Sequence, residues 1–291
     1  MTFGREKTTL VWFITGTSSG FGRRLVHIAL NRGDFVIATA RSLTGIQDFP
    51  QNEKLRLLQL DVTDGLEVIK HKVDEAVTYF GRIDVLVNNA GVGMMGFIEE
   101  GGSEHFRKQF QPNFYGMLDI TTAALPHMRM RRSGTVVIIG SRSSWSAEAP
   151  GSGSYAASKA AARVMGETLA AEVAAFSIRV LIVEPGAFCT EKIFSDPSCG
   201  GSHMPDYDGM RLKAEATCIQ VRSQLSGDPA KAMELLADVV RNEGKAKGKP
   251  WPLYLPLGEA AEVSIRNKCQ KMLDVLDEWK DVICDTKLDG P

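Results

Sequence analysis

The sequence predicts an α/β protein built on a doubly wound parallel sheet with helices on both faces. Two observations carry this prediction. Short, largely apolar runs alternate along the chain with longer segments of helical periodicity, as βαβ units require. The apolar runs are too short for helices, and they are continuous, which is typical of strands buried on both faces of a parallel sheet. With no internal repeat and no linker, we expect one domain over residues 1–291.

Each element is predicted from its own stretch of sequence. The predicted strands are residues 10–14, 35–39, 55–60, 84–87, 135–139, 178–183 and a short seventh at 253–255. The predicted helices are residues 23–31, 65–80, 103–111, 116–131, 153–175, one that begins at Asp228-Pro229, where proline suits a first turn, and 259–280. From about 188 to 227 the pattern lapses, and a C-terminal helix and tail are expected over about 259–291.

The charge balance excludes several classes of partner. The chain has 34 Lys and Arg against 35 Asp and Glu, a formal net charge of -1, with no long basic run. We therefore expect a small-molecule partner and neither nucleic acid nor a membrane. Five scattered cysteines fit neither a disulfide framework nor a metal site, and no signal peptide or membrane span is recognisable. The protein is predicted to be soluble and cytoplasmic, with no bound metal.

A glycine cluster lies between the first predicted strand and the first predicted helix. Its residues are Thr15-Gly16-Thr17-Ser18-Ser19-Gly20-Phe21-Gly22. Glycines at such a place permit a tight turn and a close approach of the backbone to a pyrophosphate, whose charge the helix N-terminus favours. A βα turn that is tight for packing alone is the alternative.

Tyr155 and Lys159 lie four residues apart on a predicted helix, so both side chains point to one face. A phenol has a pKa of roughly 10, and a neighbouring ammonium favours its ionised form. The pair is therefore a candidate acid/base device. An ordinary amphipathic helix with a tyrosine and a lysine at its surface is the alternative.

Five separated motifs resemble one family. The glycine cluster, Asn88-Asn89-Ala90-Gly91, Asn113, a serine near 141 with Tyr155/Lys159, and Pro185-Gly186 occur in the order seen in short-chain dehydrogenases/reductases. The resemblance covers about residues 8–260. It implies a Rossmann-type fold, a nicotinamide cofactor, and hydride transfer at a carbonyl or alcohol carbon.

By this resemblance, Tyr155 is the acid/base that donates a proton to the carbonyl oxygen. Lys159 lowers the Tyr155 pKa and binds the nicotinamide ribose, and Asn113 holds a water that connects Lys159 to solvent. For Asn113, a polar cap at a helix break is the alternative.

The catalytic serine is harder to assign. In the family it lies most often thirteen residues before the tyrosine, and Arg142 occupies that position here. One extra residue between 144 and 150 assigns the role to Ser141, directly after a strand, because loops absorb insertions. Ser143 is the fallback. If Arg142 itself fills the position, catalysis is in doubt.

The resemblance also implies the cofactor contacts. Besides the glycine cluster from Gly16 to Gly22, these contacts include the catalytic Tyr155 and Lys159. The remaining residues are Asp61, Val62, Asn88, Ala90, Gly91, Pro185, Gly186 and Thr190. For Asp61, a residue that merely ends a strand in a turn is the alternative.

The end of the second strand indicates the choice of cofactor. An acidic residue there would bind both ribose hydroxyls, but this chain has none and places Arg41 just beyond the strand. A guanidinium pairs with phosphate, so NADP(H) is expected. A plain solvated arginine is the alternative.

The expected function is that of an NADPH-dependent carbonyl reductase, reversible as an alcohol dehydrogenase. Residues 188–227 resemble a variable substrate lid, and Met94, Met95, Phe97 and Trp145 indicate an apolar pocket for a lipophilic ketone, aldehyde or secondary alcohol. For several of these side chains, packing in the core is the alternative. Two alternatives remain: a non-catalytic dinucleotide-binding regulator, motivated by Arg142, and an NAD-retaining epimerase or dehydratase, which Arg41 and a compact C-terminus disfavour. The resemblance implies a homodimer or homotetramer, with helices 103–131 and 153–175 as the contact. The apolar face of Ala160, Val164, Leu169 and Val173 is compatible with such a contact, and packing in the core of the same chain is the alternative.

Overall fold

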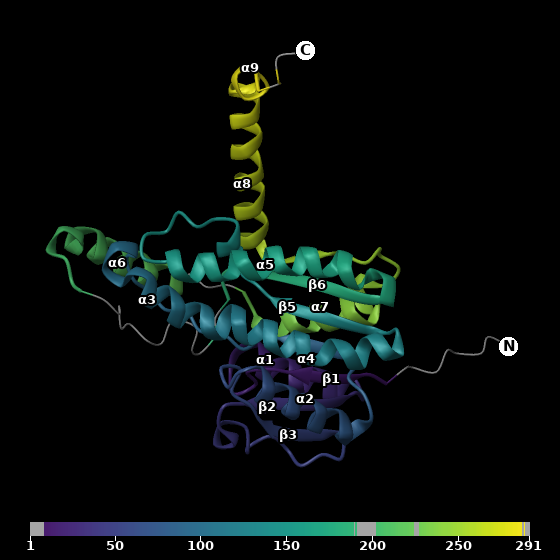
Figure 1. Ribbon diagram of the computed structural model, residues 1–291. Coiled ribbons are helices and arrows are strands. Elements are labelled where there is room, and N and C mark those ends of the chain that lie inside the picture. Colours follow the sequence, from purple (N-terminus) through teal and green to yellow (C-terminus); the bar gives the residue numbers. More distant parts are fainter. Residues whose placement is uncertain (1–8, 189, 191–201, 224–226, 287, 289–291) are drawn as a thin grey trace.

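A single seven-stranded sheet forms the centre of the molecule (Figure 1). The computed structural model describes residues 9–188, 190, 202–223, 227–286 and 288. All neighbouring strands pair in parallel, in the order β3-β2-β1-β4-β5-β6-β7. The strands are β1 Val11–Ile14, β2 Phe35–Ala40, β3 Leu55–Gln59, β4 Val85–Asn88, β5 Gly134–Ile139, β6 Ile178–Pro185 and β7 Tyr254–Leu257. The predicted doubly wound, Rossmann-type sheet is confirmed.

Helices cover both faces of the sheet. Two helices, α1 (Gly20–Asn31) and α7 (Pro229–Arg241), share one apolar cluster, and three others, α2 (Leu66–Phe80), α4 (Gly116–Arg131) and α5 (Gly153–Val173), share the other. As expected, α7 begins at Asp228-Pro229, where the Asp228 carboxylate accepts from the N–H of Ala230 at 2.8 Å. In Figure 1, α4 and α5 lie in front of the sheet and α7 behind it.

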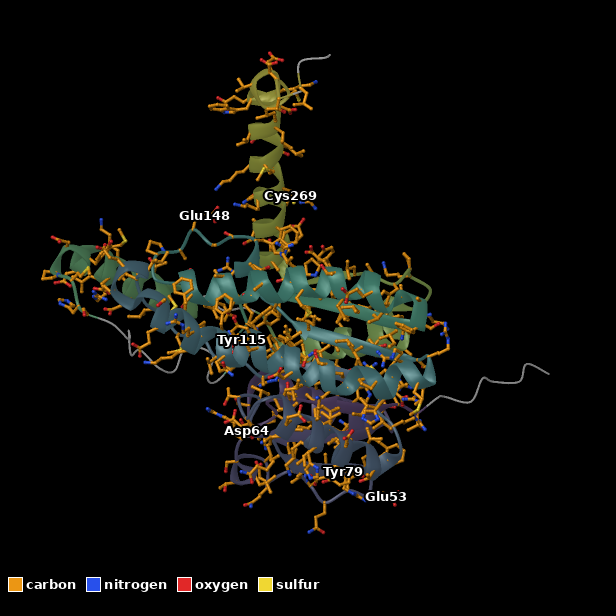
Figure 2. The ribbon with its side chains drawn as sticks, in the orientation of Figure 1. Glu53, Asp64, Tyr79, Tyr115, Glu148 and Cys269 are labelled. Carbon is orange, nitrogen blue, oxygen red and sulfur yellow. The ribbon has the colours of Figure 1, made fainter. Side chains whose placement is uncertain are left out.

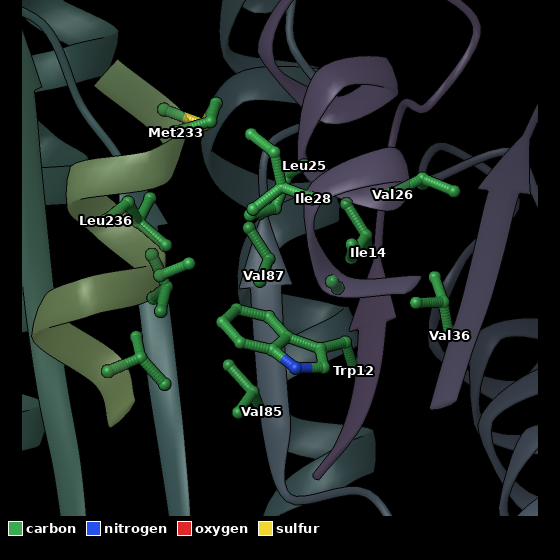
Figure 3. Packing of buried hydrophobic residues seen from close by; sticks show 14 of the residues in the cluster. Trp12, Ile14, Leu25, Val26, Ile28, Val36, Val85, Val87, Met233 and Leu236 are labelled. Carbon is green, nitrogen blue, oxygen red and sulfur yellow. The ribbon is translucent and has the colours of Figure 1, made fainter. Parts of the chain in front are cut away.

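The alternation of side chains along β1 explains its continuous apolar sequence. Trp12 and Ile14 point into the cluster beneath α1 and α7, whereas Val11 and Phe13 point into the opposite one. The Trp12 ring packs beside Val85 (Figure 3), and its Nε1 donates to the Asp34 carboxylate at 2.9 Å. A strand with helices on both sides has no solvent face, so no polar alternation is possible.

Three features differ from the sequence prediction. Helix α3 (Ile98–Phe110) starts five residues earlier than expected and contains a kink at Gly102, whose φ is 50°. A helix, α6 (Asp208–Ser223), lies within the segment where the pattern lapses; its exposed Met210 and Leu212 form no buried stripe that a periodicity could reveal. The C-terminal helices α8 (Glu259–Glu278) and α9 (Lys280–Ile283) extend away from the sheet (Figure 1), so the expected compact C-terminus is wrong.

The described residues contain neither a membrane-spanning helix nor a cluster of metal-binding side chains. No helix in them combines the length and the apolar character needed to cross a membrane. No three His, Cys, Asp or Glu residues among them are grouped so that they could share a metal ion.

Candidate functional site

The carboxyl ends of β1 and β4 lie side by side where the strand order reverses, and the glycine cluster follows β1 at this point. Open α/β sheets bind ligands in the crevice outside such a switch point. Gly16 has a φ of 70°, and a Cβ there would come within 2.8 Å of the Ala90 Cα. A Cβ on Gly22 would come within 2.5 Å of Asn89 Nδ2. Both glycines are therefore required by contact with the segment after β4.

Hydrogen bonds hold these two segments together. The Thr15 hydroxyl accepts from the N–H groups of Asn89 and Ala90, both at 3.0 Å. Asn89 Nδ2 in turn donates to the carbonyls of Thr15 at 2.8 Å and Gly16 at 3.0 Å. The sequence does not predict these roles of the Thr15 and Asn89 side chains, because each side chain binds the backbone of a segment far away in the chain.

The remaining residues of the glycine cluster divide into two groups. Thr17 is buried, and its hydroxyl donates to the carbonyl of Thr39 at 3.1 Å, so its side chain joins the turn to β2. Ser18 and Ser19 are half-buried, and the Ser19 side chain makes no capping bond at the start of α1. The first amides of α1 are therefore not occupied by their own N-cap side chain, as an anion site requires.

A third segment closes over the start of α1. An ideal Cβ on Gly20 would lie 3.8 Å from the Thr190 Cβ, and the Phe21 ring packs edge-on against Phe188 at 5.4 Å between ring centroids. Pro185 ends β6, and the N–H of Gly186 donates to the carbonyl of Leu257 at 2.9 Å. The chain after β6 therefore returns to the glycine cluster, as the sequence motif predicts.

Tyr155 and Lys159 lie on α5 with both side chains buried. The Tyr155 side chain is hydrogen-bonded to the Ser141 side chain. Lys159 Nζ donates to the carbonyl of Ile139 at 2.8 Å and lies 6.0 Å from the centroid of the tyrosine ring. The predicted shared face is confirmed, and the helix brings both groups to the carboxyl end of β5.

The acidities in this cluster differ from the expectation. Burial raises the pKa of Tyr155 above its usual range, and the hydrogen bond with Ser141 offsets only part of this effect. Burial also lowers the pKa of Lys159 to about 8, against a smaller opposite effect of Glu184. The expected lowering of the Tyr155 pKa by the lysine is therefore wrong for this structure: both groups are desolvated, and the ammonium is directed to a carbonyl.

Asn113 lies in a π-helical turn, Gln111–Tyr115, between α3 and α4. Its side chain is buried; Oδ1 accepts from the N–H of Val92 at 2.8 Å, and Nδ2 donates to the Val92 carbonyl at 2.9 Å and to Ser158 Oγ at 3.1 Å. Such single-turn π segments often occur at functional sites. Asn113 thus links the strand-end loop to α5, which is more than the helix cap that the sequence left as an alternative.

The turn after β5 distinguishes the three candidates for the serine. Ser141 is buried next to Tyr155, whereas the Ser143 N–H donates to Ser141 Oγ at 3.2 Å. The Arg142 side chain donates to Ser264 Oγ, on α8, at 3.1 Å. Of the three, Ser141 is the residue whose hydroxyl is hydrogen-bonded to the tyrosine.

A buried carboxylate holds this turn, and sequence reasoning missed it. Glu184, on β6, is fully buried and accepts from the N–H of Ser141 at 2.8 Å and from Ser144 Oγ at 3.1 Å. Burial raises the pKa of Glu184 to about 7, although these hydrogen bonds and Lys159 act in the opposite direction. An acidic residue inside an apolar strand, directly before Pro185-Gly186, was the available signal.

The residues predicted to contact the adenosine half of the cofactor follow the strands β2 and β3. Arg41 is exposed just beyond β2, and its carbonyl accepts from Gln59 Nε2 at 3.1 Å. Asp61 Oδ1 accepts from the N–H of Thr63 at 2.9 Å, so it does form the turn that the sequence left as an alternative. Val62 is buried beside Gly116, where a Cβ would come within 2.4 Å of the Val62 carbonyl oxygen.

Asn88 is the last residue of β4, and Ala90 and Gly91 lie in the segment that follows it. Asn88 is buried; its Nδ2 donates to Thr121 Oγ1 at 2.8 Å, while its Oδ1 has no hydrogen-bond partner among the described residues. Ala90 is half-buried, and Gly91 is exposed with a Cβ position 3.6 Å from Lys159 Nζ. The edge therefore combines a glycine cradle, uncapped helix amides and an exposed guanidinium, which suit a dinucleotide.

The described part of the 188–227 segment is attached to α3. The Phe97 and Tyr207 rings stack with centroids 5.0 Å apart, and the buried Glu100 accepts from Arg211 Nη2 at 2.6 Å and from the Met204 N–H at 2.9 Å. Residues 189, 191–201 and 224–226 of the predicted lid lie outside the described residues. Trp145 differs from the other predicted pocket residues, because its ring packs against the Arg163 guanidinium at 4.5 Å.

Comparisons with known proteins agree with this geometry. A family model described as short chain dehydrogenase matches residues 10–195. The chain is 32% identical over 278 residues to "Oxidoreductase BOA17" of Botryotinia fuckeliana, covering 94% of this chain and 98% of that protein. The crystal structure of a short-chain dehydrogenase from Streptomyces avermitilis has a TM-score of 0.84 and 35% identity, covering 97% of this chain and all of that one.

A further solved structure extends the comparison of the fold. A short chain dehydrogenase from Burkholderia cenocepacia, in complex with NADP, has a TM-score of 0.68 and 22% identity, covering 93% of this chain and 97% of that one. At this identity the likeness shows the fold alone. From the family match and the two relatives above 30% identity, this chain belongs to the short-chain dehydrogenase/reductase family of oxidoreductases.

Proposed function

We propose that the protein is an NADPH-dependent carbonyl reductase, reversible as an alcohol dehydrogenase. The observation that carries the proposal is the buried hydrogen bond between Ser141 and Tyr155, with Lys159 one helical turn further along α5. A neutral phenol and a serine hydroxyl side by side offer two donors to one carbonyl oxygen, as carbonyl reduction requires.

The cofactor would be held along the carboxyl edge of the sheet. The glycine cluster and the N-terminus of α1 would bind the pyrophosphate, Asp61 and Val62 the adenine, and Arg41 the 2′-phosphate of NADP(H). Asn88, Ala90 and Gly91 would adjoin the riboses, and Pro185, Gly186 and Thr190 the carboxamide side. When bound, the nicotinamide supplies the hydride that reaches the carbonyl carbon.

Side chains of this protein would donate the proton that the substrate oxygen receives. Because the pKa of Tyr155 is raised, the phenol is protonated at neutral pH and is ready to donate to the substrate oxygen. Ser141 would orient that oxygen, Lys159 would contact the nicotinamide ribose, and Asn113 would hold the water that leads to solvent. In the direction of alcohol oxidation, the phenol must first lose its proton so that its oxygen can accept one from the alcohol, and the raised pKa confines this phenolate to alkaline solution.

Side chains of the loop after β4 support the proposed substrate class. Met94, Met95 and Phe97 come from the loop after β4, and Phe97 stacks on Tyr207 of the opposite segment. These side chains favour a lipophilic ketone, aldehyde or secondary alcohol. The 188–227 segment would act as the lid over it.

A panel of carbonyl and alcohol substrates, followed by NADPH absorbance, tests the proposal. We expect Tyr155→Phe to lower turnover by at least roughly 10³-fold while NADPH binding, measured by fluorescence titration, changes little. Ser141→Ala should lower kcat, and the matched control Ser143→Ala should not. Full turnover in Tyr155→Phe, or equal losses in the two serine variants, would contradict the mechanism.

A further inference from the structure

Arg142 directly follows Ser141, and its guanidinium forms no ion pair with any described carboxylate. The side chain is half-buried and donates one hydrogen bond, from Nη1 to Ser264 Oγ at 3.1 Å. None of its unpartnered nitrogens is buried. Because a guanidinium has several N–H donors in a planar fork, most of them remain open to a ligand.

The guanidinium lies between two turns that border the reaction site. Its chain neighbour Ser141 is hydrogen-bonded to the tyrosine at the end of β5. Its partner Ser264 lies on α8 three residues after Ala261, whose backbone nitrogen is 2.8 Å from the Cβ position of Gly186 at the end of β6. Arg142 therefore bridges the turns after β5 and β6, and the proposed function brings the substrate oxygen and the nicotinamide carboxamide to these same turns.

The charge of Arg142 acts on the tyrosine. Burial has the largest effect on the pKa of Tyr155 and raises it, while the hydrogen bond with Ser141 and the positive charge of Arg142 act in the opposite direction. A positive charge within electrostatic range of the phenol also attracts an anionic group of any ligand whose oxygen faces that phenol. Arg142 is therefore suited to a ligand that is negatively charged near its reacting carbon.

A polar cavity of about 340 Å³, a volume within the range of small-molecule sites, is lined in part by Ser264. It lies between α8 and the loop that contains Ser146 and Glu148, and Figure 2 shows Glu148 on that loop beside the helix. The charged residues that line the cavity are two basic and two acidic ones: Lys268, Lys271, Glu148 and Asp274. Because these charges balance, the excess positive charge here comes from Arg142. A single positive charge suits a carboxylate better than a phosphate ester, which carries nearly two negative charges.

We propose that Arg142 pairs with a carboxylate of the substrate and thereby determines the substrate class. The substrate is then a lipophilic ketone or secondary alcohol that also carries a carboxylate. Its apolar part lies against the side chains of the loop after β4, and its charged end lies toward Arg142 and the cavity along α8. This inference rests on the proposed function, because it names the substrate class of the same site.

Binding of two unreactive ligands of equal length tests this pairing without turnover. Isothermal titration calorimetry of the full chain at pH 7, with and without NADPH, compares decanoate with decanamide. In the wild type we expect decanoate to bind roughly 10- to 100-fold more tightly, because a guanidinium–carboxylate pair adds charge-assisted hydrogen bonds that the amide lacks. In Arg142→Met, which removes the charge and keeps an apolar chain, this preference should vanish.

Two matched controls separate substrate binding from a structural role of Arg142. Ser264→Ala removes the hydroxyl that joins Arg142 to α8 but leaves the guanidinium in place. Arg266→Met removes a positive charge of the same helix that pairs with Glu262. Both variants should keep the wild-type preference for decanoate, and Arg142→Lys should keep part of it. Thermal unfolding checks that all variants are folded.

Turnover shows whether the pairing acts on the substrate. With NADPH, keto acids should have a higher kcat/KM than their methyl esters. Arg142→Met should remove this difference mainly through KM, because the carboxylate is paired both before and during hydride transfer. A merely structural role predicts equal losses for acids and esters.

Three outcomes would overturn the proposal. The wild type could bind decanoate and decanamide equally, Arg142→Met could keep the wild-type preference, or Ser264→Ala could lose the preference as completely as Arg142→Met. The proposed function fails separately, if no keto acid, ester or neutral ketone causes consumption of NADPH. In that case the affinities for decanoate and decanamide still decide whether Arg142 binds a carboxylate.

Discussion

The Glu184 carboxylate accepts a hydrogen bond from the Ser141 N–H at 2.8 Å and thereby ties the turn after β5 to the neighbouring strand β6. The carboxylate is fully buried, and burial raises its pKa to about 7. A charge in this place is costly, yet its two oxygens satisfy Ser141 and Ser144 at the point where the serine faces Tyr155. Glu184 is therefore a positioning residue for the serine turn.

The raised pKa of Glu184 predicts a pH-dependent stability. Between pH 4.5 and pH 7 the folded chain binds a proton that the unfolded chain has released, so the free energy of unfolding falls as pH rises through this window. The full effect above pH 7 is about 3 kcal/mol, at 1.36 kcal/mol per pKa unit. Urea unfolding at pH 5 and pH 8 should show this loss in the wild type and a smaller one in Glu184→Gln. The exposed Glu172→Gln on α5 should behave as wild type; the same pH dependence in all three proteins would refute the role of Glu184.

The lowered pKa of Lys159 predicts the alkaline limit of carbonyl reduction. With a pKa of about 8, the ammonium loses its proton as pH rises above that value, and the proposed contact of Lys159 with the cofactor ribose would then lose its charge. We expect kcat/KM with NADPH to fall tenfold per pH unit above about pH 8. Lys159→Arg keeps its charge, so any activity that remains should lack this limb. A wild-type profile that is flat to pH 10 would contradict the prediction.

The position of Arg41 just beyond β2 predicts a preference for NADPH over NADH. Replacing its guanidinium by a carboxylate should remove a phosphate partner and add a repulsion, so Arg41→Asp should lower the ratio of NADPH to NADH affinity by roughly 100-fold. Fluorescence titration with both cofactors measures this ratio. Arg56→Asp, which makes the same charge change on β3, is the control. A wild type that prefers NADH would show that Arg41 is a solvated charge.

The glycine turn is expected to tolerate no side chain at Gly22. In Gly22→Ala, the Cβ would come within 2.6 Å of the Gly16 carbonyl oxygen, and this backbone atom cannot move without disturbing the turn. We expect a loss of stability of about 2–3 kcal/mol and weaker dinucleotide binding. Gly209→Ala on α6, where a Cβ has open space, should be neutral or stabilising. Equal stability of the two variants in urea unfolding would exclude the close contact.

Much of the fold was predictable because its signals are local. The strands β1 to β6 were each located within two residues of their ends, since apolar runs with no solvent face are visible in the sequence itself. Helix α6 was not predictable, because a helix whose Met210 and Leu212 are exposed has no apolar face to give a periodicity. The direction of α8 was not predictable either, since an amphipathic pattern says that one face is apolar but not what covers it.

By itself, the amino-acid sequence determined the strand–glycine–helix turn and the placement of Tyr155 and Lys159 on one helical face, because each depends on residues a few positions apart. It also determined the family, because five such local motifs occur in the family's order along the chain. Only the tertiary structure decided which hydroxyl meets the tyrosine. Ser141 and Ser143 differ by two positions in one turn, and the distinction comes from Glu184, 43 residues away, which fixes the Ser141 backbone, and from Arg142, which reaches Ser264 on α8. Such contacts depend on how β5, β6 and α8 pack together, and a local sequence pattern does not encode contacts between residues that are far apart in the chain.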